Sequence, residues 1–127
     1  MRPERLVVVL GTGTGVGKTW VAAQVLARLR AGGTTVAARK PVQSHAPCDV
    51  ETDAVVLALA TGEARDTVCR PHRSYAMAMA PPIAAAFVGT APPALEDLLA
   101  ELEWPEQQVE VGVVETCLLY TSDAADE

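Results

Sequence analysis

Four glycines alternate with other residues in the segment Gly11–Gly17, and the next two residues are Lys18 and Thr19. The segment follows Leu6–Leu10, a short apolar run rich in valine and typical of a buried parallel strand. After it, apolar residues recur at helical spacing as far as Leu29. Glycine lets backbone N–H groups turn toward an anion, and the N-terminus of the following helix adds its dipole. A glycine loop in this position therefore predicts a phosphate-binding loop.

The order of the elements predicts an α/β fold with a parallel sheet and flanking helices, of the P-loop NTPase type. The first helix stops at Gly32-Gly33, and Thr35–Arg39 has the composition of a second strand, which completes a βαβ unit. Two or three parallel strands would leave an open apolar edge, so the sheet is expected to be cut short. Three further helices are predicted: Asp53–Thr61 closed by Gly62, one from Pro81-Pro82 to near Gly89, and one from Pro92-Pro93 to about Leu102. A strand is predicted within Thr67–Tyr75, although Pro71 argues against it, and a third core strand is predicted at Val109–Glu115.

Length and charge exclude several classes of protein. The chain has 127 residues, enough for one domain, and its formal net charge of −6 argues against binding nucleic acid. No apolar run approaches the length of a membrane span. Three cysteines at unrelated spacings suggest neither a disulfide framework nor a zinc site, so we expect a cytoplasmic protein with reduced thiols. Of the ten basic residues only two are lysines, Lys18 and Lys40, and both lie in motifs.

The glycine loop predicts where a nucleotide such as ATP would bind. Its backbone would cradle the phosphates, Lys18 would reach the terminal phosphates, and the Thr19 hydroxyl would be a ligand of Mg²⁺. Five residues rather than the usual four separate Gly11 from Gly17. The alternative is a glycine-rich turn that carries Gly-Lys-Thr by chance. The residues predicted to bind the nucleotide are Gly13, Thr14, Gly15, Val16, Gly17, Lys18 and Thr19.

Several motifs together resemble the dethiobiotin synthetases, the ATP-dependent ligases of biotin synthesis. They are GTGTGVGKT, KPVQS at Lys40–Ser44, TDAVVLAL at Thr52–Leu59 and MAPPIAA at Met79–Ala85. The resemblance runs from Leu6 to about Glu115 and covers the N-terminal half of such a protein. It implies a cytoplasmic homodimer that uses ATP and Mg²⁺. The implied reaction closes a cyclic urea: 7,8-diaminopelargonate takes up CO₂ to give a carbamate, ATP phosphorylates the carbamate, and the second amine displaces phosphate.

The resemblance assigns catalytic roles to Lys18, Thr14 and Lys40. Thr14 matches a position that contacts substrate or phosphate near the loop. Lys40 would stabilise the carbamate and the negative charge that grows on it, and its place after a parallel strand is where ligands of α/β proteins gather. The alternative for Lys40 is a solvent-exposed lysine in a loop.

The resemblance also implies ligands for the substrate and the metal. Ser44 and Pro81 would contact the diamine, although Ser44 could equally cap a loop and Pro81 could simply begin a helix. Asp53 and Glu115 would join Thr19 as ligands of Mg²⁺. The alternative for Asp53 is a helix N-cap, and for Glu115 a solvated acid that ends an apolar strand. The histidines and cysteines receive no role.

Two other families carry similar loops. The partition and septum-site ATPases, which use nucleotide as a switch, have a signature lysine at the place of Gly13. The amidotransferase-type synthases of cobyrinic and cobyric acid are the nearer alternative, but KPVQS fits the dethiobiotin synthetases better.

The end of the chain departs from the resemblance. In the synthetases the acid at Glu115 begins a glycine-rich run, whereas here Thr116 and CLLYTSDAADE follow. The segment Cys117–Glu127 resembles the translation of a transposon-type sequencing adapter, and the alternative is a short natural acidic tail. We therefore predict a synthetase-like domain at 1–116 and a non-native tail at 117–127. We also expect that the chain alone is truncated, unstable and inactive.

Overall fold

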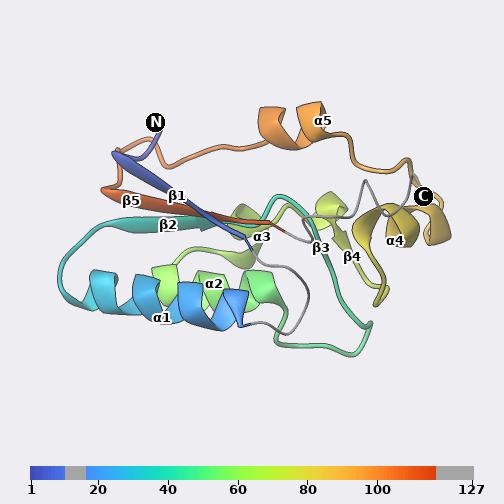
Figure 1. Cartoon of the computed structure of the whole chain (residues 1–127), viewed down its shortest axis with the longest axis horizontal. Helices are drawn as coiled ribbons and strands as arrows, with labels where there is room; N and C mark the ends of the chain where they lie inside the picture. The colour runs from blue at the N-terminus through green and yellow to red at the C-terminus, as the bar shows by residue number, and fades with distance from the viewer. Residues whose placement is uncertain (11–16, 117–127) are drawn as a thin grey trace.

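The computed structural model describes residues 1–10 and 17–116. Its main feature is a sheet of parallel strands β1 (Arg5–Val9), β5 (Val111–Glu115) and β2 (Val36–Arg39), in the order β1-β5-β2. Figure 1 shows that β5 lies between β1 and β2, although it follows both of them in the sequence. Arg5 and Val36 both pair with Val111, so the strands are aligned and their carboxyl ends lie at the same edge of the sheet.

Two helices, α1 (Lys18–Ala31) and α2 (Asp53–Thr61), pack together below the sheet in the view of Figure 1. The core between them and the sheet is built from apolar side chains, and Leu26 of α1 and Leu57 of α2 are completely buried in it. Ala38 of β2 and Val113 of β5 belong to the same cluster. The predicted α/β architecture with a parallel sheet and flanking helices is thus confirmed.

The helix ends follow from their sequences. Gly62 ends α2 with φ +80°, a left-handed conformation that glycine adopts without strain. A Cβ atom there would also lie 2.5 Å from a guanidinium nitrogen of Arg30, which would have to move aside. The first turn of α4 (Pro81–Phe87) accepts two prolines because its N–H groups need no partner inside the helix. These helix predictions are confirmed.

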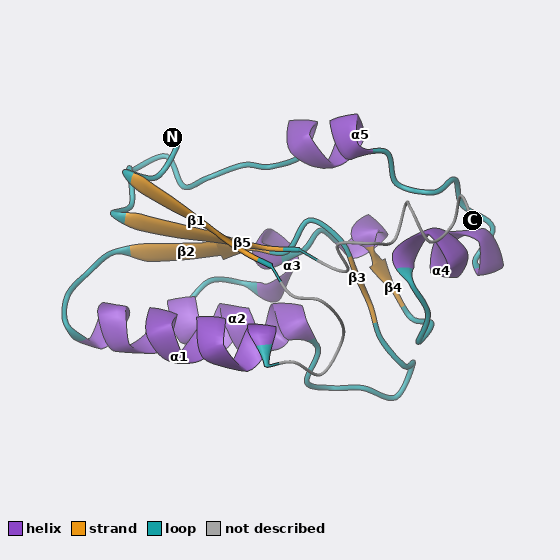
Figure 2. Ribbon diagram, in the orientation of Figure 1, coloured by secondary structure: helices purple, strands orange, loops and turns teal. Residues whose placement is uncertain are grey.

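A second, smaller unit lies beside the main sheet (Figure 2). It consists of the parallel two-residue strands β3 (Gln43–Ser44) and β4 (Ser74–Tyr75), with α4 packed against them. Val42, Tyr75, Ala84 and Ala85 form its buried core. The sequence did not indicate β3, because two residues in a polar loop carry no periodicity.

Two predicted elements are present but shorter than the ranges in which they were predicted. The strand predicted within Thr67–Tyr75 is β4 at Ser74–Tyr75, and the rest of that range contains the end of α3 (Arg65–Val68) and a 3₁₀ turn at Pro71–Arg73. Pro71 fits the first position of that turn because its ring fixes φ. The helix predicted from Pro92-Pro93 to about Leu102 is α5, which covers only Leu95–Ala100. Pro92 and Pro93 precede it, since a residue before proline avoids the helical region and acidic side chains at Glu96 and Asp97 suit the first turn.

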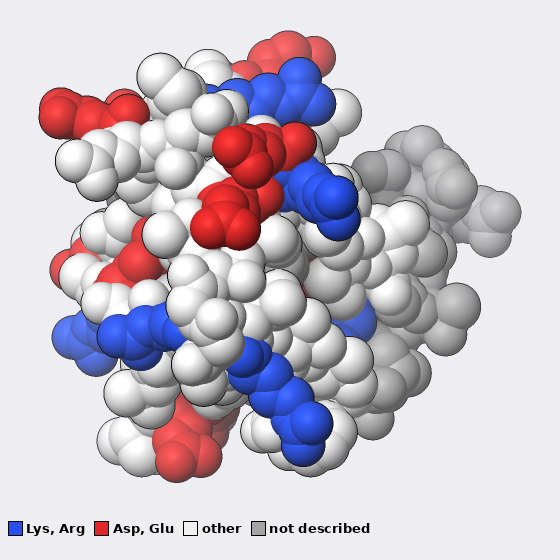
Figure 3. All heavy atoms as spheres, turned by 90° about the vertical axis from the view of Figure 1, so that its left-hand side faces the viewer, with Lys and Arg blue, Asp and Glu red and all other residues white. Residues whose placement is uncertain are grey.

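The surface carries charges of both signs. The face shown in Figure 3 has basic and acidic side chains interspersed among uncharged ones. Within residues 1–10 and 17–116, no helix is long and apolar enough to cross a membrane. The predicted tail at 117–127 lies outside the described residues.

Candidate functional site

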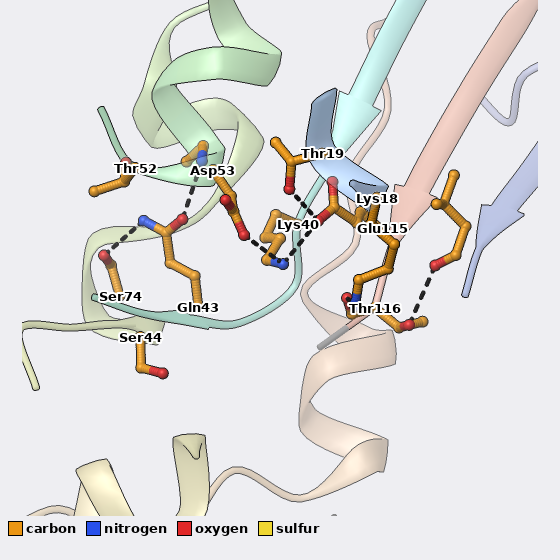
Figure 4. Close-up of polar contacts among 12 residues, drawn as sticks. Lys18, Thr19, Lys40, Gln43, Ser44, Thr52, Asp53, Ser74, Glu115 and Thr116 are labelled. Carbon is orange, nitrogen blue, oxygen red and sulfur yellow. Dashed lines mark hydrogen bonds and ion pairs between the residues drawn. The ribbon is translucent and has the colours of Figure 1, made fainter. Parts of the chain in front are cut away.

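Glu115 is the centre of a polar cluster at the carboxyl edge of the sheet (Figure 4). Its side chain is completely buried, and its Oε1 accepts hydrogen bonds from the Thr19 hydroxyl at 2.6 Å and from the Lys40 ammonium at 3.1 Å. A buried carboxylate is costly unless cations or donors compensate it. Among the described residues, its other oxygen, Oε2, has no hydrogen-bond partner. The site therefore holds a buried carboxyl oxygen that can still accept a donor or a cation.

Lys40 connects the two acidic residues of the cluster. It directly follows β2, and its side chain is only 3% exposed, which rules out the solvent-exposed lysine considered above. The ammonium lies 3.0 Å from Asp53 Oδ2 and 3.1 Å from Glu115 Oε1. Since β2 and β5 are parallel neighbours, their carboxyl ends bring Lys40 and Glu115 together.

Asp53 lies at the start of α2 but does not cap it. The cap is Thr52, whose hydroxyl oxygen accepts from the N–H of Val55 at 3.4 Å. The N-cap alternative for Asp53 is therefore wrong, and its carboxylate faces the Lys40 ammonium instead. Because this side chain is 46% exposed, it can be reached from solvent, unlike Glu115.

Lys18 and Thr19 begin α1 beside the same cluster. The Lys18 ammonium donates to the carbonyl of Thr116 at 2.9 Å, and the Thr116 hydroxyl donates to the carbonyl of Val9 at 3.2 Å. Gly17, just before the helix, has φ +89°, a conformation that strains other residues. The other predicted loop residues, Gly13, Thr14, Gly15 and Val16, lie outside the described residues.

The two predicted substrate residues lie in the smaller unit. The Ser44 hydroxyl donates to the carbonyl of Met79, and Pro81 is buried at the start of α4. Ser44 thus stabilises the segment that leads into α4, as the loop-capping alternative requires. Its contact with a substrate stays a prediction.

Two residues that join distant segments, Gln43 and Glu63, were not predicted from the sequence. Gln43 bonds both Ser74 and the first turn of α2, and Glu63 bonds the backbone of β2 and the guanidinium of Arg39. All of these contacts join residues more than ten positions apart, and no periodicity or motif marks them. The only sequence feature that could have drawn attention to Gln43 is a polar amide directly after the apolar Pro41 and Val42 of KPVQS.

In the described part of the chain, no three His, Cys, Asp or Glu side chains converge as a metal site. Asp53 and Glu115 share the Lys40 ammonium. The histidines have structural partners: His45 contacts Ser74, and His72 contacts Glu101 at 3.1 Å. Neither of these two contacts includes Glu115, Lys40 or Asp53.

An open cavity of about 170 Å³ adjoins Lys40 on the side of α3 and α5. Glu101, at its rim, accepts two hydrogen bonds of 2.9 Å from the guanidinium of Arg73. Those bonds, with a smaller effect of His72, lower the pKa of Glu101 from its ordinary 4.5 to about 2, although burial opposes the change. The same pair raises the pKa of Arg73. This pair fixes the 3₁₀ turn to the end of α5.

Comparison with curated proteins gives a consistent family. An "ATP-dependent dethiobiotin synthetase BioD" of Caulobacter vibrioides is 39% identical over 99 residues, which are 76% of this chain and 45% of that protein. The protein of the same name from Mycobacterium tuberculosis is 39% identical over 103 residues, 79% of this chain and 44% of that protein. The one from Mycolicibacterium gilvum is 36% identical over the same length. No family model matches the chain.

The chain is therefore homologous to these synthetases, and it spans somewhat less than half of their length. The homology implies the P-loop NTPase fold, in agreement with the parallel sheet β1-β5-β2 and its flanking helices.

Proposed function

We propose, on the premise of this homology, that the chain is the nucleotide-binding part of an ATP-dependent dethiobiotin synthetase. The reaction would join 7,8-diaminopelargonate and CO₂ into a cyclic urea through a phosphorylated carbamate. The observation that carries the proposal is the continuous polar cluster of Thr19, Glu115, Lys40 and Asp53 at the carboxyl edge of the sheet. Phosphoryl transfer depends on positioning and charge compensation, and such a cluster supplies both.

Nucleotide binding is assigned to the start of α1 and the loop before it. Lys18 lies in the first turn, where its ammonium would exchange the carbonyl of Thr116 for the terminal phosphates of ATP. The N-terminus of α1 also favours negative charge, because the helix dipole and the backbone N–H groups of the first turn point toward it. Backbone groups of Gly13–Gly17, together with the Thr14 side chain, would complete the contacts with the phosphates.

The residues present suit a magnesium ion. Mg²⁺ prefers oxygen ligands, and the cluster offers the orphaned Oε2 of Glu115, the Thr19 hydroxyl and the accessible carboxylate of Asp53. When bound, such an ion would supply positive charge next to the phosphates. We propose Thr19, Asp53 and Glu115 as its protein ligands.

Lys40 is proposed to act on the substrate. Its buried ammonium would stabilise the carboxylate of the carbamate and the charge that develops as phosphate is transferred and later leaves. Ser44 and Pro81, from the smaller unit, are proposed to contact the diamine. A second copy of the whole protein, forming a homodimer, belongs to the same proposal.

The test uses the protein expressed from its whole gene. ATP turnover should require both the diamine and CO₂, and it should not require glutamine. We expect Lys40→Ala to lower kcat by about a hundredfold or more, since removal of one group that stabilises transition-state charge costs that much. The affinity for ATP should change less than threefold. Arg28→Ala, an exposed change on α1, is the matched control and should alter neither value.

If Lys40→Ala reduces ATP affinity and kcat by the same factor, Lys40 binds the nucleotide rather than the carbamate. Turnover that depends on glutamine would reject the synthetase and favour an amidotransferase-type enzyme.

A further inference from the structure

The first turn of α2 is held by two side chains of different origin. Thr52, its own cap, accepts from the N–H of Val55, and Gln43 accepts from the N–H of Ala54 through its Oε1 at 3.0 Å. These N–H groups have no partner within a helix, so each needs an acceptor from elsewhere. Gln43 comes from eleven residues earlier in the chain and lies in β3.

The amide of Gln43 is fixed at both ends. Its side chain is buried, and its Nε2 donates to the Ser74 hydroxyl oxygen at 2.9 Å. The orientation of the amide is determined by its partners, because the N–H of Ala54 can only donate and so must face Oε1. The Ser74 hydroxyl then has its own proton free for His45 Nε2, which lies 3.2 Å away (Figure 4 shows the Gln43 contacts).

Lys40 and Gln43 both join the segment Lys40–Ser44 to the first turn of α2, and together they form a clamp between the two. Lys40 binds the side chain of Asp53, and Gln43 binds the backbone of the next residue, Ala54. Lys40 donates to its partner, whereas Gln43 accepts from the N–H of its partner. Both of these side chains lie on the same short segment, Lys40–Ser44, and their partners are consecutive residues of α2. Two contacts that join the same pair of segments restrain each other, so loss of one loosens the other.

We propose that Gln43 is a positioning residue for the site: by clamping the first turn of α2 to β3, it sets the distance between the Asp53 carboxylate and the Lys40 ammonium. The proposal rests on the function proposed above, in which Asp53 is a metal ligand and Lys40 acts on the carbamate. Gln43 touches neither group itself. It acts through the backbone of Ala54, which directly follows Asp53.

The two lysines of the chain make this testable without any ligand. In the whole 127-residue chain, the rate at which a small acetylating reagent modifies Lys40 is compared with the rate for Lys18 in the same molecule, by mass spectrometry of their peptides. Lys40 is only 3% exposed, and Asp53 is its solvent-facing partner. The ratio of the two rates therefore reports how firmly the first turn of α2 covers Lys40.

The variant is Gln43→Met, which keeps the length of the side chain and removes both hydrogen bonds. We expect the Lys40:Lys18 ratio to rise about tenfold. Ser74→Ala removes only the outer contact of the amide and should raise the ratio about twofold to threefold. Gln108→Met is the matched control: its amide donates to the carbonyl of Arg2 at the other end of the molecule, so the ratio should not change.

Two further variants separate positioning from general support of the fold. Asp53→Asn should raise the ratio by a similar factor, and Gln43→Met combined with it should add little, because both act on the same contact. Equal acceleration at Lys18 and Lys40 in Gln43→Met, or factors that simply multiply in the double variant, would overturn the proposal. Each variant is first checked for a cooperative unfolding transition, and Ser74→Ala gives the answer if Gln43→Met does not fold.

The functional arm uses the protein expressed from its whole gene. Gln43→Met should lower kcat about tenfold and leave the affinity for ATP within twofold, whereas Gln108→Met should leave both unchanged. A changed lysine ratio with no turnover in the unaltered protein would reject the proposed function and keep the positioning role for the Lys40–Asp53 pair. An unchanged lysine ratio in a protein that does turn over would reject the positioning role alone.

Discussion

The two outer strands of the main sheet have the same neighbour and opposite surroundings. β1 and β2 both pair with β5, yet every residue of β2 is buried, whereas Leu6, Val7 and Val8 of β1 are between 40% and 52% exposed. Both strands are apolar, so hydrophobicity does not explain the difference. What differs is the cover that the rest of the chain provides at each edge.

The outer edge of β2 is closed by side chains and by α3. The N–H of Ala38 donates to Glu63 Oε1 at 2.9 Å, and the N–H of Lys40 donates to the carbonyl of Val68 at 2.8 Å. Glu63 also pairs with Arg39, whose guanidinium lies 5.1 Å from the centre of the Trp104 ring. An unprotected edge can accept another strand, and a closed one cannot. The sheet can therefore be extended at β1 but not at β2.

The largest effect is expected when the closed edge is opened. Glu63→Ala leaves the N–H of Ala38 and the buried guanidinium of Arg39 without their carboxylate. Removal of one partner of a buried pair costs about 3–5 kcal/mol, so we expect a loss of about 3 kcal/mol in the free energy of unfolding. Urea titration measures it. Asp66→Ala, which removes an exposed acid beside Arg65, should change the value by less than 0.5 kcal/mol, since surface ion pairs contribute little.

Two leucine-to-alanine substitutions compare the free energy of unfolding that side-chain burial contributes near β2 and at β1. Leu57→Ala, in the core that covers β2, removes a completely buried side chain and should cost about 2–3 kcal/mol. Leu6→Ala on β1 removes a side chain that is already 40% exposed, and the cost should stay below about 1 kcal/mol. Similar losses from the two changes would mean that β1 is covered in solution.

The pH dependence of stability tests the contact between the 3₁₀ turn and the end of α5. Because Arg73 lowers the pKa of Glu101 to about 2, the stabilisation is complete above pH 4.5 and is lost as the pH falls toward 2. About a quarter of the Glu101 side chain is exposed, so we expect a contribution of about 1–2 kcal/mol rather than the full value of the pKa change.

Glu101→Gln should lower the free energy of unfolding at pH 6 and make the difference from the unaltered chain disappear near pH 2. A difference that stays constant between pH 6 and pH 3 would show that the Glu101 charge does not stabilise this contact.

A charged substitution on the exposed strand β1 should change the stability of the chain very little and its self-association most. Val7→Lys places a charge on the exposed edge strand β1 and should alter the free energy of unfolding by less than about 0.5 kcal/mol. It should also raise the concentration at which the chain begins to associate, measured by sedimentation. Unchanged association would mean that the edge of β1 does not bind other copies.

The features predicted from sequence were those with local signals. Periodicity and glycines predicted the limits of α1 and α2 and the strand that ends in Glu115. The predictions were inaccurate before α5, which begins at Leu95 rather than at Pro92-Pro93. They were silent where an acceptor comes from a distant residue. Glu63 at β2 and Gln43 at α2 satisfy backbone N–H groups that the sequence alone does not pair with them.

The central place of β5 has a consequence for folding. β1 pairs only with β5, and its first partner pair joins Arg5 and Val111, so the sheet depends on contacts across nearly the whole chain. Contacts of such sequence separation slow folding, because the loop must close before they repay its entropy. During synthesis on the ribosome, β1 and β2 would therefore lack their common neighbour in the sheet until residue 115 had emerged. A chaperone that shields apolar strands should therefore engage this protein early in synthesis and release it only after β5 has been inserted.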